Sequence, residues 1–189
     1  MARYVGRENV RKRLEPLAGL PGRTTYADGA ARIETGNETI TVRPPFGRGE
    51  VIDADGQPLE LVLVKNPAGF TVALSTYGTT PVTSMVAIND NYADGRDVSW
   101  LYDVSFESLR ERGVAMTSGV RAYDMALRLR YDDVAVDAIE PDLARALDRF
   151  LTEHRDEPKR IFCTYTAMMT LRRDLAARYG LANFGEDTP

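Results

Sequence analysis

Apolar runs alternate with amphipathic segments from residue 59 to near the end of the chain. Runs rich in Val, Ile, Leu, Ala and Met predict strands at 59–64, 84–88, 114–117, 134–139 and 160–163. The segments that follow them predict helices at 69–77, 106–112, 120–130, 141–153 and 166–179. In the helix at 120–130, one face carries Tyr123, Ala126, Leu127 and Arg130. This order predicts an α/β, Rossmann-like fold: a mostly parallel, doubly wound sheet with crossover helices.

The first 57 residues have a different pattern, with frequent Gly, Pro and Thr and only short periodic pieces. Residues 7–17 predict a helix that ends near the Gly and Pro residues at 19–22. Residues 31–34 and 39–43, separated by Thr-Gly-Asn-Glu, predict a β-hairpin. We therefore expect an N-terminal appendage or linker at 1–57 and the α/β domain at 58–189.

Composition limits the class of protein. The chain has 189 residues, 43% of them hydrophobic, which is enough for one main core. Its net charge of -4 favours no nucleic acid or anionic membrane as a partner. No apolar run reaches membrane-spanning length and none resembles a signal peptide, so we expect a cytoplasmic protein that is not transmembrane. One cysteine and one histidine fit a reducing compartment and cannot form the usual zinc site unaided.

The most unusual segment is NDNYADGRDVSWLYD at 89–103, which places four aspartates around Gly95 beside the only tryptophan, Trp100. It follows a predicted strand, at the edge of the sheet where the loops of doubly wound folds form their crevice. The carboxylates could bind a metal, act as a base or orient another group. They could equally cap their own backbone, as Asn and Asp often do in turns. The spacing lacks the closing Glu of a calcium-binding EF-hand loop.

Two further loops follow predicted strands. Lys65 and Asn66 precede a helix, where Lys could meet a phosphate or carboxylate and Asn could fix the turn. Ser118 and Arg121 stand at the start of the helix at 120–130. The free N–H groups there could hold an anion beside Arg121, or Ser118 could simply cap the helix.

The sequence offers no complete catalytic apparatus. Cys163 lies in a predicted buried strand and His154 at a charged helix end, so they form no nucleophile–base pair. Neither a GxxxxGK[ST] phosphate loop nor a GxGxxG dinucleotide motif occurs. The chain is therefore expected to need another polypeptide for any such chemistry.

Taken together, the polar loops resemble one family. The chain resembles the C-terminal domain of the MurT family of Mur ligases through PPFGRGE at 44–50, LVKNPAGF at 63–70, AINDNYADGRDVSWLYDVSFE at 87–107, SGVRAYDMALRLRYD at 118–132 and TYTAMMTLR at 164–172. The resemblance implies a Rossmann-like domain of the Mur ligase C-terminal type. It also implies a heterodimer with a GatD-like glutaminase, acting as lipid II isoglutaminyl synthase near the inner face of the membrane. The glutaminase takes ammonia from glutamine with a Cys and a His, and the ammonia amidates the D-glutamate of the peptidoglycan stem peptide. ATP and Mg²⁺ are expected only on a Mur central domain that this chain lacks, so no cofactor or metal is expected here.

The resemblance also assigns residues. In the family an Asp from the DGRD segment completes the glutaminase triad, and here that residue is Asp97. The residues expected to bind the partner or shape the loops are Asn66, Asn89, Asn91, Asp94, Gly95, Arg96, Trp100 and Arg121.

Two alternatives remain open. The same loops would serve a non-catalytic module that docks a partner or a peptidoglycan precursor without any proton transfer. The acidic segment would also serve an independent α/β enzyme that uses a divalent metal. Retained partner binding with no effect of Asp97→Asn on the partner's glutamine hydrolysis would favour the first alternative. Metal-dependent turnover by the isolated chain would favour the second.

Overall fold

The computed structural model describes residues 22–27, 30–35, 38–42, 48–77 and 82–181. The chain divides into two compact units, residues 1–44 and 45–189. The helix predicted at 7–17 lies outside the described residues.

The first unit contains a three-stranded antiparallel sheet in the order β1-β2-β3. Its strands are β1 (Gly22–Ala27), β2 (Ala30–Thr35) and β3 (Glu38–Val42). The pairing of β2 with β3 brings Thr35 opposite Glu38 and confirms the predicted hairpin. The sequence pattern did not predict β1, because its Gly and Pro surroundings resemble the end of a helix.

The second unit contains a six-stranded sheet in the order β4-β5-β9-β6-β7-β8. The strands are β4 (Arg48–Ala54), β5 (Gln57–Leu63), β6 (Thr83–Ala87), β7 (Val114–Ser118), β8 (Val136–Glu140) and β9 (Lys159–Cys163). Strand β4 is antiparallel to β5, and all other pairs are parallel. The mostly parallel sheet and all five predicted strands are confirmed. Strand β9, the last in the chain, lies between β5 and β6. The strand order therefore reverses between β6 and β9, and folds of this type form their crevice at such a reversal.

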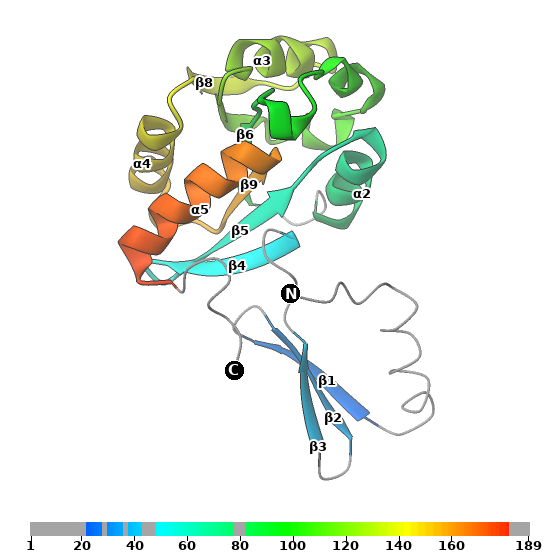
Figure 1. The fold of residues 1–189 in the computed structure, drawn as a ribbon, viewed down its shortest axis with the longest axis vertical. Coiled ribbons are helices and arrows are strands. Elements are labelled where there is room, and N and C mark those ends of the chain that lie inside the picture. The colour runs from blue at the N-terminus through cyan, green and yellow to red at the C-terminus, as the bar shows by residue number, and fades with distance from the viewer. Residues whose placement is uncertain (1–21, 28–29, 36–37, 43–47, 78–81, 182–189) are drawn as a thin grey trace. The chain divides into compact units, whose positions relative to one another are not determined.

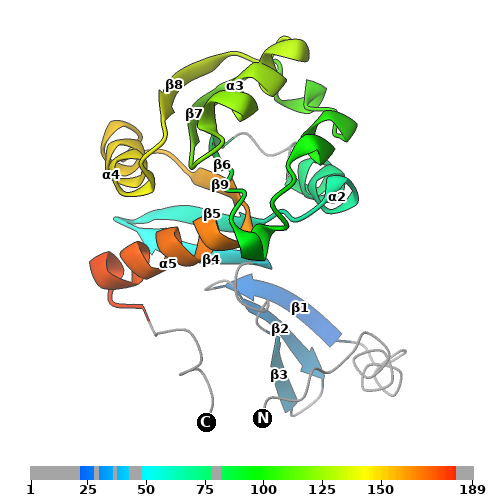
Figure 2. The same ribbon diagram turned by 45° about the horizontal axis from the view of Figure 1, so that its top comes forward.

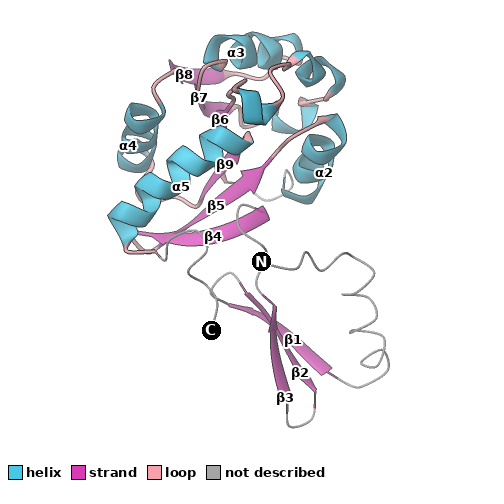
Figure 3. Ribbon diagram, viewed as in Figure 1, coloured by secondary structure: helices cyan, strands magenta, loops and turns pink. Residues whose placement is uncertain are grey.

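Helices cover both faces of this sheet (Figure 1, Figure 3). One face packs against α2 (Pro67–Tyr77) and α3 (Ala122–Tyr131), and the other against α4 (Leu143–Glu153) and α5 (Tyr165–Tyr179). The turned view in Figure 2 also separates these two pairs of helices. Along β6, Met85 contributes to the core under α4 and α5, while Val86 contributes to the core under α2 and α3. Burial on both faces explains why the strands read as continuous apolar runs.

The sheet unit begins at residue 45, whereas the sequence pattern placed the boundary between residues 57 and 58. The difference is β4, an edge strand with one buried face: Ile52 and Ala54 are buried and Val51 is exposed. Glu50 also pairs with Arg172 of α5 at 2.9 Å. Short edge strands of this kind carry polar residues and resemble linkers in sequence.

Two helix details differ from the sequence pattern. The helix predicted at 106–112 is only a 3₁₀ turn, η4 (Glu107–Leu109), followed by Gly113 at a φ of 73°. The buried residues of α3 are Ala122, Met125, Arg128 and Leu129, while Tyr123 and Leu127 are exposed. The buried Arg128 occupies a position that a purely apolar pattern leaves on the outside.

Candidate functional site

The carboxyl ends of β6, β7 and β9 are joined by Asn89, whose side chain is buried. The Asn89 backbone N–H donates to Thr164 Oγ1 at 2.8 Å, and its Nδ2 donates to Thr166 Oγ1 at 3.0 Å. Its Oδ1 accepts from the Val120 backbone N–H at 3.0 Å. Asn89 therefore shapes the crevice from within and presents little surface to a partner, being 4% exposed.

The first part of the acidic loop, residues 89–103, is hydrogen-bonded to the N-terminus of α5. Asp94 Oδ1 accepts from the Thr166 backbone N–H at 2.9 Å, and Asp94 Oδ2 accepts from the Thr166 hydroxyl at 2.5 Å. Asn91 Nδ2 also donates to Thr166 Oγ1 at 2.9 Å. A carboxylate at a helix N-terminus is favourable because it meets unpaired N–H groups and the positive end of the helix dipole.

Asn91 and Asp94 also cap the 3₁₀ turn η2 (Tyr92–Asp94), where the Asn91 N–H donates to Asp94 Oδ2 at 3.1 Å. Thr166 is thus the centre of this contact network, although sequence reasoning did not single it out. The only signal was its position just after a buried strand.

Asp97 follows two residues of left-handed backbone conformation, Gly95 at φ 101° and Arg96 at φ 53°. Its side chain is exposed, and its Oδ1 accepts from the Ser99 backbone N–H at 2.8 Å. Hydrogen bonds from the Ser99 hydroxyl and then from its N–H hold the pKa of Asp97 below the ordinary value. Asp97 is therefore an ionised carboxylate that faces solvent beside Arg96, which is also exposed.

Trp100 lies in the next 3₁₀ segment, η3 (Ser99–Asp103). Its half-buried ring packs edge-on against Phe70 of α2, with ring centroids 6.4 Å apart. At the start of α2, Asn66 Oδ1 accepts from the Gly69 N–H at 2.7 Å. The Asn66 side chain thus shapes its own turn, and Trp100 attaches η3 to the core.

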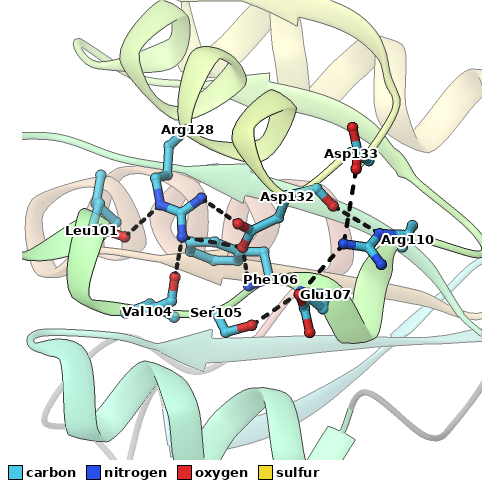
Figure 4. Close-up of polar contacts among 9 residues, drawn as sticks. All are labelled: Leu101, Val104, Ser105, Phe106, Glu107, Arg110, Arg128, Asp132 and Asp133. Atoms are coloured by element: carbon cyan, nitrogen blue, oxygen red, sulfur yellow. Dashed lines mark hydrogen bonds and ion pairs between the residues drawn. The ribbon is translucent and has the colours of Figure 1, made fainter.

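A buried arginine that the sequence did not reveal holds the far side of the acidic loop. Arg128 of α3 is 6% exposed. Its Nε donates to the Leu101 carbonyl at 3.0 Å and its second terminal nitrogen to the Val104 carbonyl at 2.5 Å (Figure 4). The acidic loop is therefore attached at both ends, on α5 and on α3.

Arg121 is engaged by neighbouring carboxylates. Its guanidinium pairs with Asp90 at 3.3 Å and with Asp124 at 3.4 Å. Ser118 is buried and does not cap α3, because Arg121 occupies the N-cap position and makes no side-chain cap bond. The expected helix cap at Ser118 is thus wrong. Arg121, with two carboxylates beside it, is poorly suited to hold an anion.

The cysteine and the histidine are separated by the length of β9. Cys163 is buried at the carboxyl end of this strand, and burial raises the pKa of its thiol far above the ordinary value. His154 caps the C-terminus of α4 before β9 begins and lies 3.5 Å from Glu157. This pair has neither the proximity nor the thiolate that cysteine catalysis needs.

Neither a metal-binding cluster nor a membrane-spanning helix is present in the described part of the chain. No three His, Cys, Asp or Glu side chains there gather closely enough to hold a metal ion. Within the same residues, no helix combines the length and the apolar character that crossing a membrane requires.

Comparison with known proteins gives one consistent family. A family model described as MurT ligase C-terminal matches residues 63–168. The lipid II isoglutaminyl synthase (glutamine-hydrolyzing) subunit MurT of Streptococcus pneumoniae is 35% identical over 143 residues, covering 72% of this chain and 32% of the relative. The subunit of the same name from Staphylococcus aureus is 35% identical over 119 residues, covering 60% and 27%. The chain thus spans about a third or less of the curated relatives it matches.

Solved structures agree on the fold. A folylpolyglutamate synthase from Thermotoga maritima aligns with a TM-score of 0.51 at 15% identity, covering 86% of this chain and 47% of that one. MurF from Acinetobacter baumannii aligns with a TM-score of 0.50 at 15% identity, covering 82% and 44%. At these identities the likeness concerns the α/β architecture alone.

Proposed function

The chain belongs to the family of MurT ligase C-terminal domains, and on that premise we propose that it docks a GatD-like glutaminase and supplies Asp97 as the third member of the partner's Cys–His–Asp triad. A carboxylate hydrogen-bonded to the partner's imidazole fixes its tautomer and stabilises the imidazolium that forms with the cysteine thiolate. This chain then contributes a single carboxylate to glutamine hydrolysis, in the active site of the partner subunit.

One observation carries the proposal: Asp97 is exposed and ionised, on a loop attached at both ends. A carboxyl whose pKa lies at or below the ordinary value is ionised over the whole neutral range, so Asp97 carries the negative charge that an imidazolium requires. The exposed Arg96 is suited to contact the partner, since Arg is enriched in interfaces. Asn89, Asn91, Asp94, Gly95 and Trp100 shape the acidic loop that carries these two residues, and Asn66 shapes the turn before α2.

In the full reaction, ammonia released by the glutaminase amidates the D-glutamate of the lipid II stem peptide. The relatives are named as subunits of a glutamine-hydrolysing lipid II isoglutaminyl synthase. We place the binding of ATP and Mg²⁺ on a Mur-type central domain, outside the residues of the proposed site. The complex works in the cytoplasm, at the inner face of the membrane where lipid II is available.

The test measures glutamine hydrolysis by the GatD-like partner with the wild-type chain and with Asp97→Asn. An amide in this position favours the wrong imidazole tautomer, so we expect kcat to fall by roughly 10³- to 10⁴-fold. Asp103→Asn, at an exposed position of the same loop, is the matched control and should leave kcat unchanged. Equal rates for Asp97→Asn and wild type, with partner binding retained, would leave a docking module that takes no part in the chemistry.

A further inference from the structure

We propose that Arg128 and Asp132 of the α3 region are positioning residues for Asp97, which hold the carboxyl-terminal half of the acidic loop in a single geometry. The inference rests on the proposed role of Asp97. It assigns a function to the ion pair between the buried Arg128 and the half-buried Asp132, which lies outside the loop itself (Figure 4).

The guanidinium of Arg128 fixes the backbone where η3 ends. Its donors reach the carbonyls of Leu101 at 3.0 Å and Val104 at 2.5 Å. The side chains of Leu101 and Val104 are buried, so these carbonyls depend on a partner within the protein. The guanidinium carbon also lies 5.2 Å from the centroid of the Phe106 ring. The planar fork of arginine thus contacts the loop and the residues after it at three successive points.

Asp132 is the partner of Arg128, and the two residues together are called the clasp. Its Oδ1 pairs with Arg128 at 2.9 Å, and its Oδ2 accepts from Arg128 at 3.1 Å and from the Phe106 N–H at 2.6 Å. Burial by itself raises the pKa of Asp132, but the bonds from Arg128 and Phe106 outweigh it and lower the pKa. The Asp132 backbone carbonyl accepts from Arg110 at 3.0 Å, which ties η4 to the same point.

The clasp is connected to Asp97 through η3. Asp97 accepts a hydrogen bond from the backbone N–H of Ser99, which is the first residue of η3. Within η3, the Leu101 N–H donates to the Val98 carbonyl at 3.0 Å. Upstream, Asp94 is fixed on Thr166 of α5. Asp97 therefore lies on a short span between two anchored points, and a shift of η3 moves its carboxylate.

Stability alone does not account for a charged pair at this position. Well-packed apolar residues often stabilise a core as well as a buried ion pair does, because desolvating two charges costs free energy. The ion pair differs from apolar residues because its hydrogen bonds are directional. These hydrogen bonds fix the backbone of Leu101, Val104 and Phe106 in one arrangement. A carboxylate that has to reach another protein's imidazole needs such fixed geometry, since small displacements of catalytic groups reduce rates strongly.

The experiment measures glutamine hydrolysis by the GatD-like partner with Arg128→Lys and Asp132→Asn. The control is Arg130→Lys, an exposed arginine on the same helix. We expect kcat to fall on the order of 10- to 100-fold for the two clasp variants. The KM for glutamine and the Kd of the complex should change less than about two-fold, because both side chains are largely enclosed within this chain and present little surface to a partner. Assays are run at a temperature where circular dichroism shows every variant folded.

A second readout separates positioning from a structural role. Asp97→Asn added to Arg128→Lys should lower kcat no further than Asp97→Asn does by itself, because the clasp acts only through that carboxylate. Folded clasp variants with wild-type kcat, or losses that multiply with that of Asp97→Asn, would overturn the inference while leaving the role of Asp97 intact. If Asp97→Asn by itself left kcat unchanged, the proposed function would fail first, and the two failures are thus distinguishable.

Discussion

At the scale of single residues, the crevice depends on a close backbone approach at Gly119. Its φ is 87°, and a Cβ there would lie 2.5 Å from the Ile88 carbonyl and 2.7 Å from Asn89 Oδ1. Only glycine fits, because both the left-handed conformation and the contact exclude a side chain. The strand ends that carry the acidic loop can meet closely for this reason.

Gly119→Ala is therefore expected to lower the free energy of unfolding by about 2–4 kcal/mol, the sum of backbone strain and overpacking. Gly56→Ala is the matched control, because Gly56 has a φ of 85° but a Cβ added there would meet no atom within 4 Å. Its cost should be about 1 kcal/mol, from the backbone alone. Urea unfolding of both variants gives the comparison, and equal losses would contradict the contact at Gly119.

Asp132 should give the chain a measurable dependence on acid. Its folded pKa lies below the ordinary 3.8, so its contribution to stability is complete above that value and is lost as the pH falls through the folded pKa. At pH 7 we expect Asp132→Asn to be less stable by about 1–3 kcal/mol. This difference should shrink as the pH is lowered below about 4 and through the folded pKa. Asp133→Asn, at an exposed neighbouring position, should show no such convergence, and a constant difference for Asp132→Asn would refute the argument.

At the scale of elements, α3 shows that the buried face of a helix can include an arginine. Met125, Arg128 and Leu129 are buried together, and Leu127 is 52% exposed. Tyr131, also exposed, meets Tyr102 of η3 edge-on with centroids 6.1 Å apart. The helix therefore serves as the support of η3 as well as a cover for the sheet.

Leu129→Ala should lower the free energy of unfolding by about 2–5 kcal/mol, because it empties a fully buried site. Leu127→Ala makes the same chemical change two positions earlier and should cost less than about 1 kcal/mol. Chemical denaturation of the pair tests the orientation of α3, and a larger loss for Leu127→Ala would show the opposite face to be buried.

At the scale of the whole molecule, the two units differ in what they contribute. All the residues of the proposed site lie in the unit 45–189, which has its own cores on both faces of the sheet. Strand β4 belongs to this unit through its pairing with β5 and through Glu50 and Arg172. The folding unit thus begins before residue 58.

Two truncations test this boundary. A chain of residues 45–189 is expected to unfold cooperatively with a Tm within a few degrees of the full chain. A chain of residues 58–189 should lose about 3 kcal/mol or more, because it removes Ile52 and the edge strand that covers β5. Calorimetry of both chains decides the matter, and equal stability would place β4 outside the unit.

The sequence by itself determined the α/β architecture, because periodicity reports which elements are buried on two faces, and five strands appear where their apolar runs stand. The resemblance of its polar loops to the MurT family also singled out Asp97, and the catalytic role of this carboxylate stays a prediction. Tertiary structure decided the rest. Thr166, Arg128 and Asp132 hold the acidic loop through contacts between residues far apart in the chain, such as Thr166 with Asp94 and Arg128 with Leu101. No local pattern records such contacts, since a buried arginine and a surface arginine are identical in sequence until the fold gives one of them its partners.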